Sequence, residues 1–187
     1  EDGFVTIARA AGIVAFPSRF MLVAAMNPCP CGHFGSAAQA CRCSPGQIQR
    51  YLGRVSGPLL DRIDIQIEVE AVPFGEMTAP ADAEPSEAVR ERVNAARARQ
   101  VARYAGERFF CNAQLPPRQQ RRFCALDEEG KAMMNQVFND LQLSARAYTR
   151  ILRVARTIAD LSGAENITAD HLAEAIQYRS LDRKYWR

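Results

Sequence analysis

Four of the six cysteines have the side-chain type and the spacing of metal ligands. They form two C-x-C pairs with nine residues between them: Cys29, Cys31, Cys41 and Cys43. Four thiolates can close a tetrahedral zinc site, and Gly32 and Gly35 give the loop the freedom to bring the pairs together. The usual spacing is C-x-x-C, so two alternatives stay open: His33 replaces one cysteine, or the loop holds free, partly buried thiols.

Two polar residues stand where a ligand could be bound. Asn27 follows the apolar run at 20–26, and open α/β folds place ligand contacts at the carboxyl ends of such strands. Asparagine is also common in turns that bind nothing. Arg62 lies in PLLDRID between two aspartates, and an arginine in that setting most often pairs with them. A partner's phosphate would instead make Arg62 an arginine finger.

A basic stripe runs along SARAYTRILRVARTIADL, residues 144–161. On a helix of 3.6 residues per turn, one side carries four arginines: Arg146, Arg150, Arg153 and Arg156. The opposite side is apolar: Ala147, Ile151, Val154, Ala155 and Ile158. Such a stripe is usually a solvated helix face. The alternative is a face directed at a bound polyphosphate.

The elements that would position these residues begin with strands. Residues 4–7 and 13–16 are β-prone runs around a small-residue tip, which predicts a hairpin that ends at Pro17. The apolar run at 20–26 predicts a strand covered on both faces, as in a parallel sheet. Residues 63–70, IDIQIEVE, alternate apolar and polar side chains and predict a strand with one solvated face.

Helices are expected on both sides of a linker. Ser44 and Pro45 suit an N-cap and a first helical position, so 47–52 is predicted to be helical, with Gly53 as its stop. A second short helix is expected after Ser56. Beyond residue 85 the expected helices span 86–104, 117–124, 127–139, 144–161 (with Gly163 as stop) and 168–179 (with Thr168 as N-cap).

These elements predict three parts. Residues 1–72 are expected to form an α/β part, and residues 86–187 an all-α domain. Between them, residues 73–85 are rich in proline, alanine and acidic side chains and are expected to form a linker.

The composition is that of a globular protein, with 48% hydrophobic and 24% charged residues. A net charge of +3 does not by itself identify a nucleic-acid binder, but residues 92–122 hold eight arginines and one glutamate. No apolar run approaches the roughly 18 residues of a membrane span, and no signal peptide precedes Glu1, so a cytoplasmic location is expected. In that reducing compartment Cys111 and Cys124, in apolar segments, are expected to be core residues.

Four stretches together resemble a known family. They are EDGFVTIARAAGIVAFPSRFMLVAAMNPCPCG, CRCSPGQIQRYLGRVSGPLLDRIDI, LSARAYTRILRVARTIADLSG and HLAEAIQYRSLDR. They closely resemble the carboxyl-terminal part of the magnesium-chelatase-like AAA+ ATPases of bacteria, the ComM-type competence proteins. The resemblance covers almost the whole chain. Together with a first residue that is not methionine, it predicts a piece of a longer protein.

The resemblance implies a partial AAA+ core with a β-hairpin before the sensor-1 strand, followed by a helical lid. Arg9, near the hairpin tip, matches a basic residue that related helicases use to contact DNA in the pore of a ring. Asn27 matches sensor 1, which orients the attacking water, and Arg62 matches the arginine finger, which reaches the ATP of the neighbouring subunit. Arg146 matches the sensor-2 arginine, with Arg150 as the alternative.

The sequence lacks the family's phosphate-binding loop and magnesium site. It contains no G-x-x-x-x-G-K-[ST] and no apolar run ending in Asp-Glu, so this chain alone is expected not to hydrolyse ATP. For the full-length protein the resemblance implies ATP and Mg2+ as cofactors. It also implies a ring oligomer, a hexamer, that binds DNA and no membrane.

The expected function is ATP-driven DNA translocation or branch migration in competence and recombination. One alternative is a magnesium chelatase ATPase subunit that drives metal insertion into a porphyrin; the double C-x-C loop, which resembles the ComM-type branch, favours the first function. The other alternative is a non-enzymatic zinc module that binds nucleic acid or a partner protein. Because the strand at 20–26 lacks its sheet neighbours here, the chain is also expected to expose an apolar strand edge and to self-associate.

Overall fold

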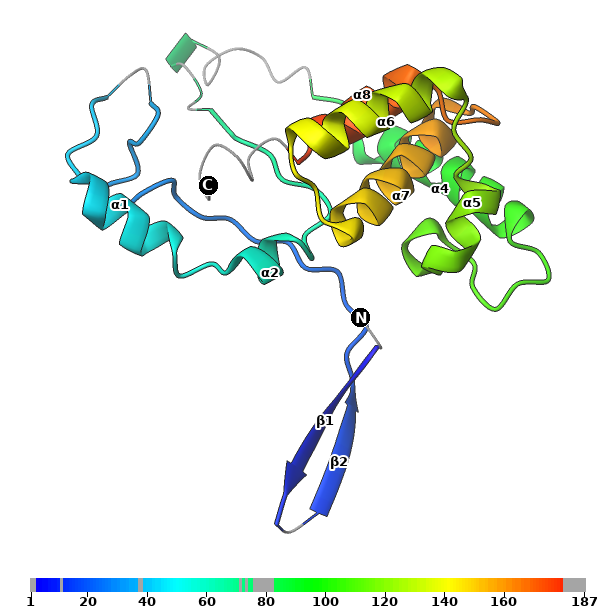
Figure 1. Cartoon of the computed structure of the whole chain (residues 1–187), viewed down its shortest axis with the longest axis horizontal. Helices are drawn as coiled ribbons and strands as arrows, with labels where there is room; N and C mark the ends of the chain where they lie inside the picture. The colour runs from blue at the N-terminus through cyan, green and yellow to red at the C-terminus, as the bar shows by residue number, and fades with distance from the viewer. Residues whose placement is uncertain are drawn as a thin grey trace. The chain divides into compact units, whose positions relative to one another are not determined.

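The computed structural model describes residues 3–10, 12–36, 39–70, 72, 74–75 and 83–179. The chain divides into two compact units, Glu1–Cys43 and Ser44–Arg187 (Figure 1). The first unit holds a two-stranded sheet, and the helices belong to the second. Most of the linker predicted at 73–85 lies outside the described residues.

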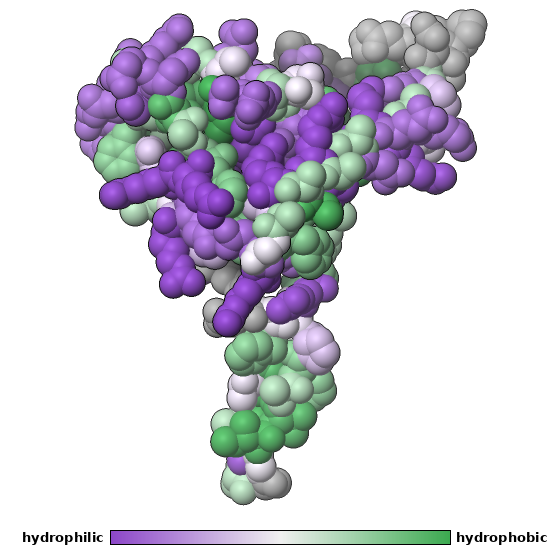
Figure 2. Space-filling model, turned by 90° about the vertical axis from the view of Figure 1, so that its right-hand side faces the viewer, coloured by the Kyte–Doolittle hydropathy of each residue, from purple (hydrophilic) through white to green (hydrophobic). Residues whose placement is uncertain are grey.

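The first unit begins with an antiparallel hairpin of β1, Phe4–Arg9, and β2, Gly12–Pro17. Arg9 pairs with Gly12, so Arg9 is the last strand residue before the turn. The β-branched and aromatic residues of the two strands favour an extended backbone. Every side chain of both strands is exposed, and the hairpin surface is therefore largely hydrophobic (Figure 2). The predicted hairpin and its end at Pro17 are confirmed.

Residues 20–26 do not form the predicted strand. Met21 and Val23 are 88% and 86% exposed. A strand that is apolar on both faces needs neighbouring strands to bond its backbone and to cover its side chains, and the hairpin is the one sheet among the described residues. The apolar side chains are exposed as expected, but the strand whose edge they were expected to form is absent. Self-association stays a prediction.

Residues 63–70 are a second predicted strand that the structure does not form. The Gln66 N–H donates to the Tyr178 carbonyl (3.0 Å), but Ile65, Ile67 and Val69 are more than half exposed. Alternation decides which side chains share a face, whereas a ladder requires a second strand. The α/β prediction for the first part is therefore wrong in these two strands. The described fold is helical with a small two-stranded sheet.

The second unit opens with two short helices that local signals define. Helix α1, Pro45–Leu52, begins at Ser44, which forms a capping box with Gln47. Gly53 ends the helix. Helix α2, Gly57–Leu60, follows after one turn. Both predicted short helices are confirmed.

The helical region, residues 86–179, is built around α7, Ala145–Ser162. Helix α7 packs on α4 (Ser86–Arg103), α5 (Gln120–Phe123), α8 (Ala169–Gln177) and the 3-10 turn η1 (Asn112–Gln114), while α6 (Glu128–Asp140) packs on α8 (Figure 1). The core is apolar and includes Leu115, Ile151, Ala155, Ala159 and Leu172. The predicted helices are confirmed, except that 117–124 is divided into the 3-10 turn η2, Pro117–Gln119, and α5. Within the described chain, no helix is long and apolar enough to cross a bilayer.

Both ends of α7 are fixed by local caps. The Ala147 N–H donates to the Ser144 hydroxyl (3.1 Å) at the start of the helix. Gly163 ends it in the left-handed conformation, with φ of +78°. Thr168 then caps α8. The predicted stop at Gly163 and the predicted cap at Thr168 are confirmed.

Replacing Gly163 by alanine is expected to lower the free energy of unfolding by about 1–2 kcal/mol, because a Cβ disfavours left-handed backbone. The new Cβ would also lie 3.1 Å from Nη2 of Arg99, whose Nη1 donates to the Asp160 carbonyl (2.9 Å). Urea unfolding followed by circular dichroism measures the change. Gly46→Ala, in the first turn of α1, is the matched control, because a Cβ there meets nothing within 4 Å. Equal losses in the two variants would contradict the backbone argument.

Candidate functional site

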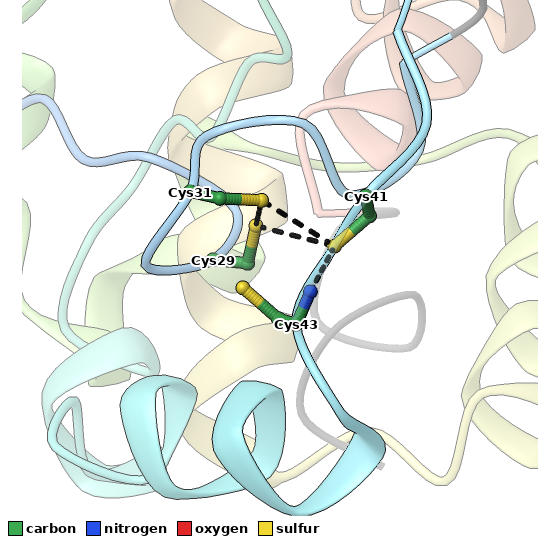
Figure 3. A group of neighbouring side chains, drawn as sticks. All are labelled: Cys29, Cys31, Cys41 and Cys43. Carbon is green, nitrogen blue, oxygen red and sulfur yellow. Dashed lines mark hydrogen bonds between the residues drawn. The ribbon is translucent and has the colours of Figure 1, made fainter.

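The four predicted cysteine ligands come together in the first unit (Figure 3). Their Sγ atoms all lie within 4.8 Å of one another: Cys29, Cys31, Cys41 and Cys43. The Sγ of Cys29 is 3.4 Å from that of Cys31 and 3.7 Å from that of Cys41, and all four thiols are free. A tetrahedral ion with Zn–S bonds of ~2.3 Å separates its sulfurs by about 3.8 Å. The cluster therefore has the donor set and the size that fit a four-cysteine zinc site.

Backbone turns direct the sulfurs toward one another. The Gly32 N–H donates to the Cys29 carbonyl (3.0 Å). Gly32 and Gly35 both have φ of +83°, which a residue without Cβ adopts at little cost. In the second pair, the Cys43 N–H donates to the Cys41 Sγ (3.4 Å). Figure 3 shows the first pair on one loop and the second pair on the segment that leads into α1, with the side chains directed at a common centre.

Backbone donors stabilise a thiolate within the cluster. The N–H groups of Arg42 and His33 are directed at the Cys31 sulfur and lower its pKa to about 6. A thiolate is the form of cysteine that binds metals. Among the described residues, the group of possible ligands contains the four cysteines and not the His33 ring. The arrangement thus favours four cysteines over the alternative with histidine.

The other two cysteines are core residues, as predicted. Cys111 and Cys124 are both buried in the helical region. Burial raises the pKa of Cys124 to about 11. Its thiol is therefore protonated at neutral pH, which makes it a poor nucleophile and a poor metal ligand.

Arg62 is exposed and pairs with neither of the aspartates beside it. Its Nη1 donates to the Pro58 carbonyl (2.6 Å), one turn earlier in the chain. The structure therefore does not support the alternative in which Arg62 simply pairs with Asp61 and Asp64. The reason is that other arginines occupy both carboxylates.

These arginines come from the helical region. Asp61 lies 3.5 Å from the Nη2 of Arg179 and accepts a hydrogen bond from the Ser144 hydroxyl (3.2 Å). Asp64 forms an ion pair with Arg150 of α7. The segment that carries Arg62 is thus bound to two arginines that lie far from it in sequence.

The predicted basic stripe is not a solvated face. Arg146 is exposed at the first turn of α7, but Arg150 and Arg156 are buried. Arg156 donates to the Glu165 and Ala164 carbonyls (2.8 Å each). Because α7 is the central helix, its neighbours cover its polar side as well as its apolar side. Of the two sensor-2 candidates, only Arg146 is accessible to a ligand.

Asn27 and Arg9 are both exposed in the first unit. Asn27 lies beside the first cysteine turn, because a Cβ placed on Gly32 would be 3.8 Å from the Asn27 Nδ2. Arg9 stands at the end of β1, as the sequence predicts. The roles that the resemblance implies for both residues stay predictions.

Sequence reasoning missed a buried polar network in the helical region. The Asp160 carboxylate is fully buried and accepts hydrogen bonds from Arg103 and from the Asn112 Nδ2 (2.8 Å). Arg156 lies 3.2 Å from the same carboxylate, and the Tyr104 hydroxyl donates to Asn112 Oδ1 (2.6 Å). The available signal was an aspartate four residues after Arg156 on the basic stripe, the spacing of an intrahelical ion pair.

Two family models match this chain. The model described as "Magnesium chelatase, subunit ChlI" matches residues 1–77. The model described as "Magnesium chelatase, subunit ChlI C-terminal" matches residues 83–179. Together they cover most of the chain, including the cysteine cluster, Arg62 and α7.

Curated relatives match over almost the same length. The "Competence protein ComM" of Haemophilus influenzae is 46% identical over 98% of this chain, and the "Uncharacterized protein YifB" of Escherichia coli is 42% identical over 98%. The "Uncharacterized protein Rv2897c" of Mycobacterium tuberculosis is 36% identical over 96%. The chain spans 35% of the length of each of these relatives. With both family models matched, the chain belongs to the magnesium chelatase subunit ChlI family, as its motifs predict.

Proposed function

We propose that this chain is the carboxyl-terminal part of an AAA+ ATPase motor in which Arg62 is the arginine finger. The observation that carries this proposal is the exposed guanidinium of Arg62, beside two aspartates that other arginines hold. A guanidinium that pairs with no carboxylate among the described residues can bind a phosphate through two hydrogen bonds. On a neighbouring subunit's ATP it would stabilise the charge that develops on the transferring phosphoryl group.

Two further residues would serve the same reaction. Asn27 would act as sensor 1 and orient the attacking water. Arg146 would act as the sensor-2 arginine, because it is exposed while Arg150 is buried against Asp64. Bound ATP and Mg2+ would supply the phosphoryl group and neutralise its charge. In the proposed full-length protein, other residues than those of this chain would hold them.

The full-length protein would work as a ring, a hexamer, in the cytoplasm. Because the finger acts on a neighbouring subunit, the active unit must be an oligomer. DNA is the proposed substrate, moved by translocation or branch migration, and Arg9 would contact its phosphates. The similarity to a relative named as a competence protein supports this choice.

A second candidate is a magnesium chelatase ATPase subunit, which the description of the matched family favours. An ATPase assay on the full-length protein distinguishes the two functions. Turnover that rises when DNA is added supports the DNA motor. Turnover that is unchanged by DNA but rises when a magnesium-chelatase partner and a porphyrin are added would overturn the DNA motor. A non-enzymatic zinc module predicts no turnover in either assay.

The four-cysteine cluster is proposed to hold a structural zinc ion. Protein purified without added zinc is expected to contain about one zinc per chain, as in other four-cysteine sites. Cys41→Ser should lose most of the metal, because a hydroxyl binds zinc much more weakly than a thiolate. Cys111→Ser is the matched control and should keep it, since Cys111 lies outside the cluster. Inductively coupled plasma mass spectrometry measures the content, and a clearly substoichiometric result would refute the zinc site.

A further inference from the structure

The segment around Arg62 is held on both sides by arginines of the helical region. Asp61 precedes Arg62 and pairs with Arg179, which follows α8. Asp64 lies two residues after Arg62 and pairs with Arg150 in the second turn of α7. Two ion pairs therefore bracket one exposed arginine.

Backbone contacts strengthen this attachment. Arg179 Nη1 donates to the Ile63 carbonyl (2.6 Å), so Arg179 binds the main chain next to Arg62 as well as Asp61. The Gln66 N–H donates to the Tyr178 carbonyl (3.0 Å). The main chain on the carboxyl side of Arg62 is thus fixed to the end of α8.

The burial of the two arginines gives these pairs a preferred geometry. Arg179 is 2% exposed and Arg150 is 8% exposed. A buried guanidinium needs a carboxylate or carbonyl partner, since its charge is costly away from water. Asp61 and Asp64 provide that partner from side chains that are 33% and 54% exposed. Moving the segment away from the helical region would expose or separate these charges.

We propose that Arg150 and Arg179 are positioning residues that hold Arg62 in the orientation in which it acts as the finger. The inference rests on the proposed function and adds two consequences. First, the arginines occupy the two carboxylates that would otherwise compete with a phosphate for Arg62. Second, they tie the position of Arg62 to the position of α7 and α8.

The second consequence links the subunit's own nucleotide to the neighbour's. Arg146 and Arg150 are four residues apart on α7, so they lie on the same side of one rigid helix. A shift of α7 when Arg146 binds phosphate would move Arg150 and, through Asp64, the Arg62 segment. The helical region would then couple the nucleotide bound at one ATP site to the position of Arg62 at the neighbouring ATP site.

The test uses steady-state ATPase kinetics of the full-length protein with Asp64→Asn, Asp61→Asn and the double variant. Each substitution keeps the side-chain shape and removes the charge that holds the arginine. A misplaced finger is expected to lower kcat by roughly tenfold to a hundredfold while KM for ATP stays near the wild-type value. Asp64→Glu, which retains the charge, should recover part of kcat. Asp140→Asn, at an exposed aspartate of α6, is the matched control and should keep wild-type kcat.

A double-mutant cycle separates positioning from general stability. In the Arg62→Ala background, Asp64→Asn should lower the residual turnover no further, because the finger is already absent. Labelled ATP makes this residual turnover measurable. If Asp64→Asn is as harmful without Arg62 as with it, or if the double aspartate variant keeps wild-type kcat, the inference fails while the motor function stands. Normal turnover of Arg62→Ala itself would instead refute the proposed function.

Discussion

Replacing Arg62 by alanine in the full-length protein is expected to lower ATP turnover by roughly 10³- to 10⁵-fold, the contribution of an arginine finger. ATP binding should change little, because a finger contributes most of its interaction in the transition state. Arg62 is exposed, and its guanidinium contacts the Pro58 carbonyl of the same short helical segment. Its removal is therefore expected to leave the fold intact.

Phosphate release measures the turnover of this variant, and a fluorescent ATP analogue measures binding. Arg54→Ala is the matched control, since Arg54 is an exposed arginine in the same unit, and it should turn over ATP like wild type. Mixing provides a sharper readout. Arg62→Ala subunits added to wild-type protein should reduce ATPase activity more than simple dilution does. The reason is that each variant subunit leaves the ATP site of its neighbour without an arginine finger. Unchanged turnover in Arg62→Ala would show that Arg62 is not the finger.

The helices of this chain could be predicted because the signals that define them are local. Ser44 and Gln47 form the capping box of α1 from residues three positions apart. Gly163 ends α7 because its own backbone takes a left-handed conformation. Neither signal depends on what packs against the helix, so the sequence was sufficient.

The strands could not be predicted in the same way. An apolar run such as 20–26, or the alternation at 63–70, describes a surface that would suit a sheet. The ladder itself requires a partner strand, and the described residues provide one only within the hairpin. Where both strands of a pair lie in the chain and follow one another, as β1 and β2 do, the prediction was correct.

The candidate site shows the same difference between local and distant information. The cysteine cluster could be predicted from spacing, because only nine residues separate the two pairs in the chain. The partners of Asp61 and Asp64 could not be predicted in this way. Arg179 lies 118 residues after Asp61, and Arg150 lies 86 residues after Asp64. They meet these aspartates only through the packing of α7 and α8. The periodicity of α7 identified its basic side correctly but carried no information on what covers that side.

The basic side of α7 gives the second large expected effect: Asp160→Asn should destabilise the helical region by about 3–5 kcal/mol, the usual cost of breaking a buried ion pair. The carboxylate is fully buried and holds Arg103, Arg156 and Asn112. An amide would leave two guanidinium groups without their counter-charge. Burial already lowers the pKa of Arg156, and Asp160 opposes that effect.

Urea unfolding of this chain, followed by circular dichroism, measures the loss. Asp140→Asn makes the same chemical change at an exposed aspartate in the last turn of α6 and should alter stability by about 0.5 kcal/mol or less. A loss at Asp160 no larger than the loss at Asp140 would mean that water or neighbouring carbonyls satisfy the arginines. The expected large difference would instead make Asp160 the residue that allows α7 to bury Arg156 on its basic side.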